Sequence, residues 1–230
     1  MEFVKSEMRD GICVLRLDHG KPNSISKAVA DELMSGLAQA EESADAVVIL
    51  GRAGMFSGGF DLPTMGKGPE AVRGMLTAGA ELLMAIYDHA KPVVIGCTGH
   101  AIAMGTFITM AGDERIGAAG DFKLGMNESA IGMTLPTFAL ELARARLSKR
   151  HFDRALVHST IYDPEGACKV GILDRIVAPD RLEAECFDAA GRLAKLKQPA
   201  FQNNKRLAHG ATVDLIRSTL EENLNSLMPG

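Results

Sequence analysis

Two glycine-containing turns are the parts of this sequence whose backbone could do chemistry. FSGGFDL (residues 56–62) and GHAIAMG (residues 99–105) each follow a β-rich segment, and the second leads into a helix-like segment almost without charge. Two such turns side by side would present two backbone N–H groups, one at a helix start, to a single negative oxygen. In a dry pocket, this pair stabilises charge that develops on a carbonyl oxygen. On spacing alone, the glycines Gly58, Gly59, Gly99 and Gly105 fit tight turns and helix packing at least as well.

Several ionisable residues near these turns are candidates for proton transfer. Glu128 could act as a base, but a single acidic residue usually lies on the solvated surface. Asp113 and Glu114 come at a predicted helix end before a strand, where acidic residues commonly mark a boundary. His100 lacks an acidic partner or a second residue at metal-ligand spacing, which favours a hydrogen-bonded structural histidine. The residue pattern alone therefore assigns no catalyst.

Alternating strands and helices must position these residues. The segments 11–18, 46–52 and 92–97 are rich in β-branched and apolar residues, as in buried strands. Ser26 is placed to cap the helix between the first two strands, and Pro69 to begin the helix before the third. This alternation is typical of an α/β fold.

The second half continues the pattern and ends in helices. A helix around 105–111 is followed by two short β-like segments, ERIGA and FKLGM, and by a helix after Pro136. Asp163 is placed to cap a further helix, and residues 199–228 read as one or two amphipathic helices. Because no linker precedes this tail, we expect it to pack on a neighbour rather than to form a domain of its own.

Composition limits the classes of function. The 230 residues are 47% hydrophobic with a net charge of −4, which disfavours disorder and a nucleic-acid partner. The four cysteines have no CxxC spacing, so we expect reduced thiols and a cytoplasmic protein. The sequence has no run of eighteen apolar residues, and we expect neither membrane insertion nor export.

Taken together, the motifs resemble those of the crotonase superfamily, the enoyl-CoA hydratases and isomerases. The resemblance is carried by FSGGFDL, by KPVVIGCTGHAIAMGTFITMAGDERI (residues 91–116) and by FKLGMNESAIGMTLP (residues 122–136). PNSIS (residues 22–26) and the segment at 164–177 add weaker support. The resemblance spans nearly the whole chain, and the motifs are specific in combination.

The resemblance implies an α/β fold with a crotonase-like ββα spiral core and a C-terminal helical region. Residues 1–195 would form the core, and residues 196–230 a helical trimerisation segment of the same domain. A homotrimer or a dimer of trimers is expected. No metal and no separate cofactor are implied, because coenzyme A is part of the substrate.

The resemblance also assigns roles to individual residues. The backbone N–H groups of Phe60 and Met104 would bind the thioester oxygen of an acyl-CoA, and Glu128 would be the catalytic carboxylate. The residues expected to contact coenzyme A or the acyl group are Ser24, Ile25, Gly58, Asp61, Leu62, Gly105, Phe107 and Met133. Burial among Met126, Ile131, Met133 and Phe107 would raise the pKa of Glu128.

Two departures from the family pattern bear on the reaction. The resemblance implies that hydratases of this family use two glutamates. In this sequence Phe107 stands at the first of these positions and Glu128 at the second. Met104 stands where the family usually has glycine. One carboxylate suffices to convert a 3-enoyl-CoA into the 2-enoyl isomer, which is the expected activity. The alternatives are an enoyl-CoA hydratase of fatty acid oxidation and a non-catalytic acyl-CoA binding protein.

Overall fold

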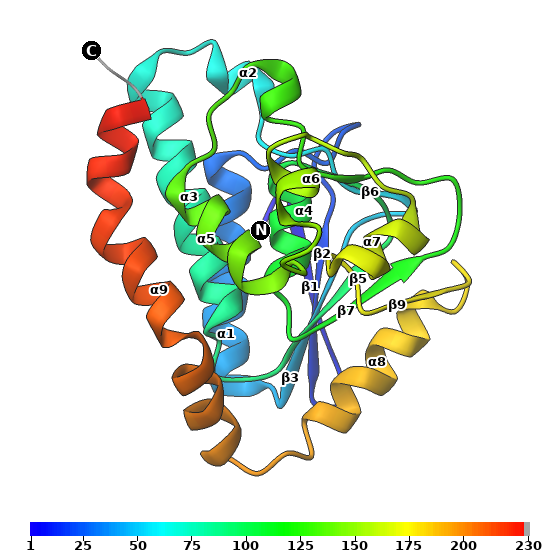
Figure 1. The fold of residues 1–230 in the computed structure, drawn as a ribbon. Helices are drawn as coiled ribbons and strands as arrows, with labels where there is room; N and C mark the ends of the chain where they lie inside the picture. The colour runs from blue at the N-terminus through cyan, green and yellow to red at the C-terminus, as the bar shows by residue number, and fades with distance from the viewer. Residues whose placement is uncertain (228–230) are drawn as a thin grey trace.

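Residues 1–227 of the computed structural model form a spiral of strands and helices that ends in a long helix (Figure 1). The larger sheet has the strand order β1-β2-β3-β5-β7-β9. Only the β1–β2 pair is antiparallel. The strands are β1 (Val4–Arg9), β2 (Ile12–Leu17), β3 (Ala46–Leu50), β5 (Val93–Cys97), β7 (Glu114–Ala118) and β9 (Arg175–Val177).

A smaller parallel sheet carries the segments of chemical interest. Its strands, in the order β4-β6-β8, are β4 (Gly54–Ser57), β6 (Gly99–Ile102) and β8 (Leu124–Gly125). The chain leaves β4 just before Gly58, β6 just before Ala103, and β8 just before Met126. Because the carboxyl ends of parallel strands meet at one edge of a sheet, these three segments emerge side by side.

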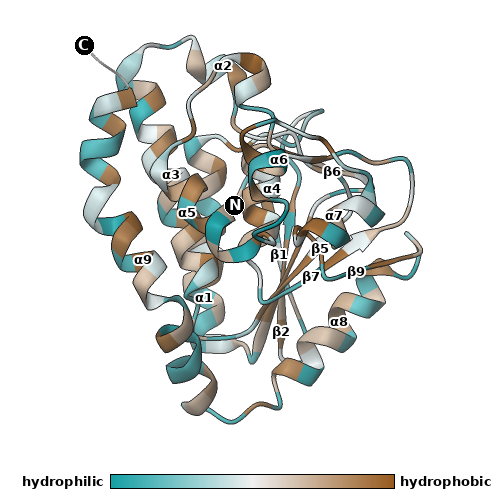
Figure 2. Cartoon of the chain, in the orientation of Figure 1, coloured by the Kyte–Doolittle hydropathy of each residue, from teal (hydrophilic) through white to brown (hydrophobic). Residues whose placement is uncertain are grey.

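Helices cover both faces of the larger sheet. Figure 1 shows α8 on one side of it and α1, α3 and α9 on the other, and Figure 2 shows hydrophobic residues gathered on the strands between them. The α-helices are α1 (Lys27–Ser43), α2 (Leu62–Met65), α3 (Pro69–Tyr87), α4 (Met104–Ala111), α5 (Thr137–Arg146), α6 (Phe152–Leu156), α7 (Pro164–Val170), α8 (Leu182–Leu193) and α9 (Ala200–Leu227), and Ser129–Ile131 form a 3₁₀ turn.

The predicted fold is confirmed, and several of its local signals act as expected. The Ser26 side chain accepts a hydrogen bond from the Val29 N–H at the start of α1, and Pro69 begins α3. The Asp163 carboxylate caps α7 by accepting from the Gly166 N–H at 2.7 Å. The sequence analysis missed β1, because this edge strand buries only Val4 and is otherwise made of exposed, mostly polar residues.

The C-terminal tail is a single helix, α9, that packs on α3 and α5 of its own chain. Val213, Ile216 and Leu224 are buried in this contact. The expected trimer and the division of the chain at residue 196 stay predictions, since a single chain is described. Within residues 1–227, no helix is long and apolar enough to cross a bilayer.

A buried ion pair ties the first half of α9 to the core. The Lys205 ammonium lies 2.6 Å from the Asp113 carboxylate, and the two side chains are 4% and 13% exposed. Asp113 also accepts a hydrogen bond from the Val93 N–H at 2.8 Å. Removing one partner of such a pair leaves an uncompensated charge in a poorly solvated site.

We therefore expect Asp113→Ala to lower the free energy of unfolding by about 3 kcal/mol, because Lys205 loses its counter-charge. Adding Lys205→Met should restore part of this loss, since the unpaired ammonium is then removed. Urea unfolding of the wild type and both variants measures the difference. A double variant less stable than Asp113→Ala would show that the pair is not the reason.

Candidate active site

A cavity of about 700 Å³ lies where the three segments leave the smaller sheet. Gly58 and Phe60 line it after β4, Met104 after β6, and Asn127 and Glu128 after β8. The two glycine-containing turns and the candidate carboxylate, which are far apart in the sequence, thus face one space. Helices α3, α5 and α9 supply part of the remaining wall, and the loop from Ile131 to Pro136 supplies another part.

The first turn places Phe60, one of the two expected backbone donors, at this cavity. The neighbouring backbone groups are used in a bridge to Ile25: the Ile25 N–H donates to the Gly59 carbonyl at 2.8 Å, and the Asp61 N–H donates to the Ile25 carbonyl at 3.0 Å. In extended chain, successive N–H groups point to opposite sides. The amide of Phe60 therefore points away from Ile25, on the side of the segment that this pairing does not use.

The second turn presents the N–H of Met104, the first residue of α4. The first amides of a helix have no partner within the helix, and Met104 is reached through Ala103, whose φ is 51°. The two turns are in contact: a Cβ on Gly59 would lie 3.0 Å from the Ile102 carbonyl oxygen and 3.5 Å from the Met104 nitrogen. Gly59 also has a φ of +100°, so both its backbone conformation and its surroundings favour glycine.

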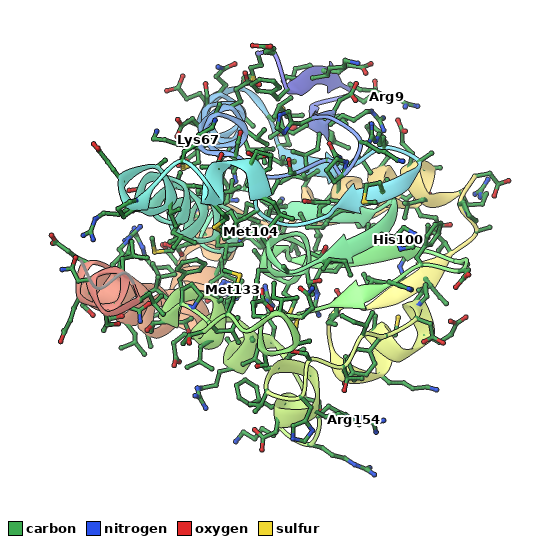
Figure 3. All side chains as sticks on the ribbon, turned by 90° about the horizontal axis from the view of Figure 1, so that it is seen from above. Arg9, Lys67, His100, Met104, Met133 and Arg154 are labelled. Atoms are coloured by element: carbon green, nitrogen blue, oxygen red, sulfur yellow. The ribbon has the colours of Figure 1, made fainter. Side chains whose placement is uncertain are left out.

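The methionine side chain at this position reaches α3. Met104 is 1% exposed, and its methyl group lies 3.4 Å from where a Cβ on Gly79 of α3 would be. The Phe60 ring packs against the same glycine. Figure 3 shows Met104 and Met133 close together near the centre of the molecule. A bulky residue is thus accommodated because α3 has no side chain at residue 79.

Glu128 is a buried carboxylate with an unused oxygen. The residue is 8% exposed, and its Oε2 has no hydrogen-bond partner among residues 1–227. Burial raises the pKa of Glu128, and the N–H groups of Glu128 and Asn127 offset only part of that effect. The loop is held by its backbone, with the Met133 N–H donating to the Glu128 carbonyl at 2.8 Å. A carboxyl group in this state is suited to accept and return a proton.

Most residues that line the cavity around Glu128 are apolar. Phe107, Ile131 and Met133 line the cavity, whereas Met126, expected beside them, is buried in the core and outside the lining. Among the described residues that line the cavity, Glu128 is the one with an ionisable side chain. The pKa of Glu128 is thus raised by burial, as the sequence analysis expected.

The other residues expected to contact coenzyme A or the acyl group fall into two sets. Gly58, Leu62, Phe107 and Met133 line the cavity. Ser24, Ile25, Asp61 and Gly105 do not line it: the Ser24 hydroxyl donates to the Asp61 carboxylate at 3.0 Å, and Asp61 caps α2. Ile25 is fully buried, and a Cβ on Gly105 would lie 2.4 Å from the Ser57 carbonyl oxygen. This second set holds the two turns in place within the chain.

The remaining ionisable candidates have structural partners. Asp113 pairs with Lys205, and the Glu114 carboxylate pairs with Arg175 and Arg192. The His100 Nδ1 accepts from the Lys123 N–H at 3.0 Å, and Figure 3 shows His100 on a strand well away from Met104. None of these three residues lines the cavity, in agreement with the structural roles expected from the sequence.

Several lining residues were not anticipated from the sequence. They are Val72 and Leu76 of α3, Phe138 and Ala139 of α5, and Asn223, Ser226 and Leu227 of α9. Apolar residues at helical spacing predict only a buried face, which does not distinguish core from cavity wall. No local motif marks the α9 residues, because their place in the wall depends on how the last helix folds back.

Comparisons with known proteins agree with this geometry. Residues 7–226 match the sequence profile of the family described as enoyl-CoA hydratase/isomerase. A solved structure of an enoyl-CoA hydratase/isomerase family protein from Pseudomonas syringae is 34% identical, with a TM-score of 0.96 and 99% of each chain covered.

Two curated relatives show the same relationship in sequence. Human mitochondrial enoyl-CoA delta isomerase 1 is 26% identical over 215 residues, 91% of this chain and 71% of the relative. A probable enoyl-CoA hydratase of Mycobacterium avium is 28% identical over 204 residues, 84% of this chain and 77% of the relative. The chain therefore belongs to the enoyl-CoA hydratase/isomerase family of enzymes.

Proposed function

We propose that this enzyme converts 3-enoyl-CoA thioesters into 2-enoyl-CoA thioesters, with Glu128 as the only proton-transferring residue. The observation that carries the proposal is the lining of the cavity. Glu128 is its one ionisable side chain among the described residues, and the buried Phe107 ring faces the same space. A single carboxylate in a mostly apolar cavity suits proton transfer within one substrate better than the activation of water.

The substrate would bind with its thioester oxygen against the N–H groups of Phe60 and Met104. Glu128 removes a proton from C2, and the electron pair moves into a dienolate whose charge rests on the thioester oxygen. The two N–H groups stabilise that charge. The protonated Glu128 then delivers the proton to C4, and the double bond ends between C2 and C3. The carboxylate is regenerated, so no other reactant is consumed.

Two features support the stabilisation of this intermediate by the backbone. The Met104 amide stands at the N-terminus of α4, where the helix dipole adds partial positive charge. The bridge to Ile25 fixes the direction of the Phe60 amide before substrate binds. Donors that are already oriented need no rearrangement when charge develops, which is the condition for large electrostatic effects.

Replacing Glu128 by Gln should lower turnover of a 3-enoyl-CoA by about 10²- to 10⁴-fold, because the base is lost while the shape of the side chain is kept. Formation of the conjugated 2-enoyl thioester, followed by its ultraviolet absorbance, measures the effect. The same assay with a 2-enoyl-CoA tests hydration. Full turnover by Glu128→Gln contradicts the mechanism, and Glu128-dependent hydration as the main reaction would replace isomerisation with the hydratase alternative.

The raised pKa of Glu128 gives a pH dependence with a defined sign. Because the carboxylate is the active form, kcat/KM should fall at low pH with a midpoint above the ordinary glutamate pKa of about 4.3. A group whose pKa is raised by folding destabilises the folded state once it ionises. Glu128→Gln should therefore raise the free energy of unfolding at about pH 8 and have little effect at low pH. An acid midpoint at or below the ordinary value, with no gain in stability, contradicts this account.

A further inference from the structure

The last turns of α9 form part of the same cavity as the proposed catalytic residue. Asn223, Ser226 and Leu227 line the space that Phe60, Met104 and Glu128 also line. In Figure 1 the end of α9 lies beside α3, at the side of the molecule away from α8. A helix that packs against the outside of the core thus reaches the cavity with its C-terminal end.

Asn223 fixes this end of α9 to α5. Helix α5 begins at Thr137, and the residue before it, Pro136, provides no side-chain cap. The Asn223 Oδ1 accepts a hydrogen bond from the Thr137 N–H at 2.8 Å. An amide in the first turn of a helix lacks a partner within the helix, and here a side chain from a different helix supplies it. Asn223 therefore lines the cavity and holds two helices together at its wall.

A second contact fixes the same end of α9 to α3. The Arg73 guanidinium donates to the Asn225 Oδ1 at 2.6 Å and lies 4.0 Å from the Glu221 carboxylate. The end of α9 is thereby joined to α5 on one side and to α3 on the other. These are the helices whose apolar residues, including Leu76 and Phe138, line the cavity and are buried.

The proposed chemistry sets the direction of the acyl chain in this space. If the Phe60 and Met104 amides hold the thioester oxygen and Glu128 lies beside C2 and C4, the remaining carbons continue past Glu128. The apolar residues of α3 and α5 favour a hydrocarbon chain there. We propose that the end of α9 is the far wall of the acyl site and that it sets the longest acyl chain bound in full. Asn223 is the positioning residue that holds this wall. This inference rests on the proposed function.

Binding of saturated acyl-CoAs of increasing length tests the proposal without requiring turnover. Each methylene buried in an apolar site strengthens binding about fourfold. We expect the affinity of the wild type to rise in such steps and then to level off when the chain reaches α9. Calorimetric titration with an even-numbered series from butyryl-CoA to palmitoyl-CoA locates the length at which the rise stops.

Variants should move that length in opposite directions. Asn223→Ala, which frees the wall, should let the rise continue by at least one two-carbon step, and Asn223→Asp, which keeps an oxygen acceptor for Thr137, should restore the wild-type limit. Ser226→Trp should stop the rise at a shorter chain. Asn203→Ala is the matched control, because Asn203 is an exposed asparagine of the same helix outside the cavity.

The outcomes separate this inference from the proposed function. If both variants fold and the longest acyl chain bound in full stays the same, α9 does not set the limit. If Asn223→Ala does not fold, an unchanged limit in Ser226→Trp is enough to overturn the role of α9. A wild-type affinity that rises without any limit overturns it as well. Failure of the wild type to bind any acyl-CoA contradicts the proposed function itself.

Discussion

The carboxyl ends of β4, β6 and β8 meet at one edge of a small parallel sheet, and the candidate site depends on this constraint. Phe60, Met104 and Glu128 each follow one of these strands within three residues. Parallel pairing brings together groups that the sequence separates. The larger sheet and its helices surround this edge with apolar residues, so that the groups face a cavity rather than bulk water.

Within this arrangement, the cavity has one lining carboxylate, Glu128, and among residues 1–227 its Oε2 has no hydrogen-bond partner. The bridge to Ile25 uses the Gly59 carbonyl and the Asp61 N–H, and it leaves the Phe60 amide between them out of the pairing. Burial raises the pKa of Glu128 and disfavours the folded state when this residue is ionised. Functional sites commonly keep such groups despite their effect on stability. The structural carboxylates differ in this respect, since Asp113 and Glu114 each have a cationic partner.

The sequence predicted the fold and the two turns because their signals are local. Buried β-branched strands, Ser26 as a cap and Pro69 at a helix start each act within a few residues. The positions of Ser24 and Asp61 could not be predicted in the same way, because they depend on a hydrogen bond between two loops. The same is true of Asn223, whose partner is the first amide of a distant helix. The methionine at residue 104 could not be explained from the sequence either, because it is accommodated by Gly79, which lies on a different helix.

The carbonyl stretch of a bound thioester is the most direct test of whether the Phe60 and Met104 amides bind the thioester oxygen. With an acyl-CoA labelled with carbon-13 at the thioester carbonyl, infrared difference spectra should show a shift to lower frequency on binding to the wild type, because two N–H groups polarise the bond. Glu128→Gln should keep the shift, since its backbone is unchanged. Gly59→Ala should lose most of it, because the added Cβ lies against Ile102 and the Met104 amide. A bound carbonyl that absorbs as it does in water, or a shift that survives in Gly59→Ala, would contradict the account.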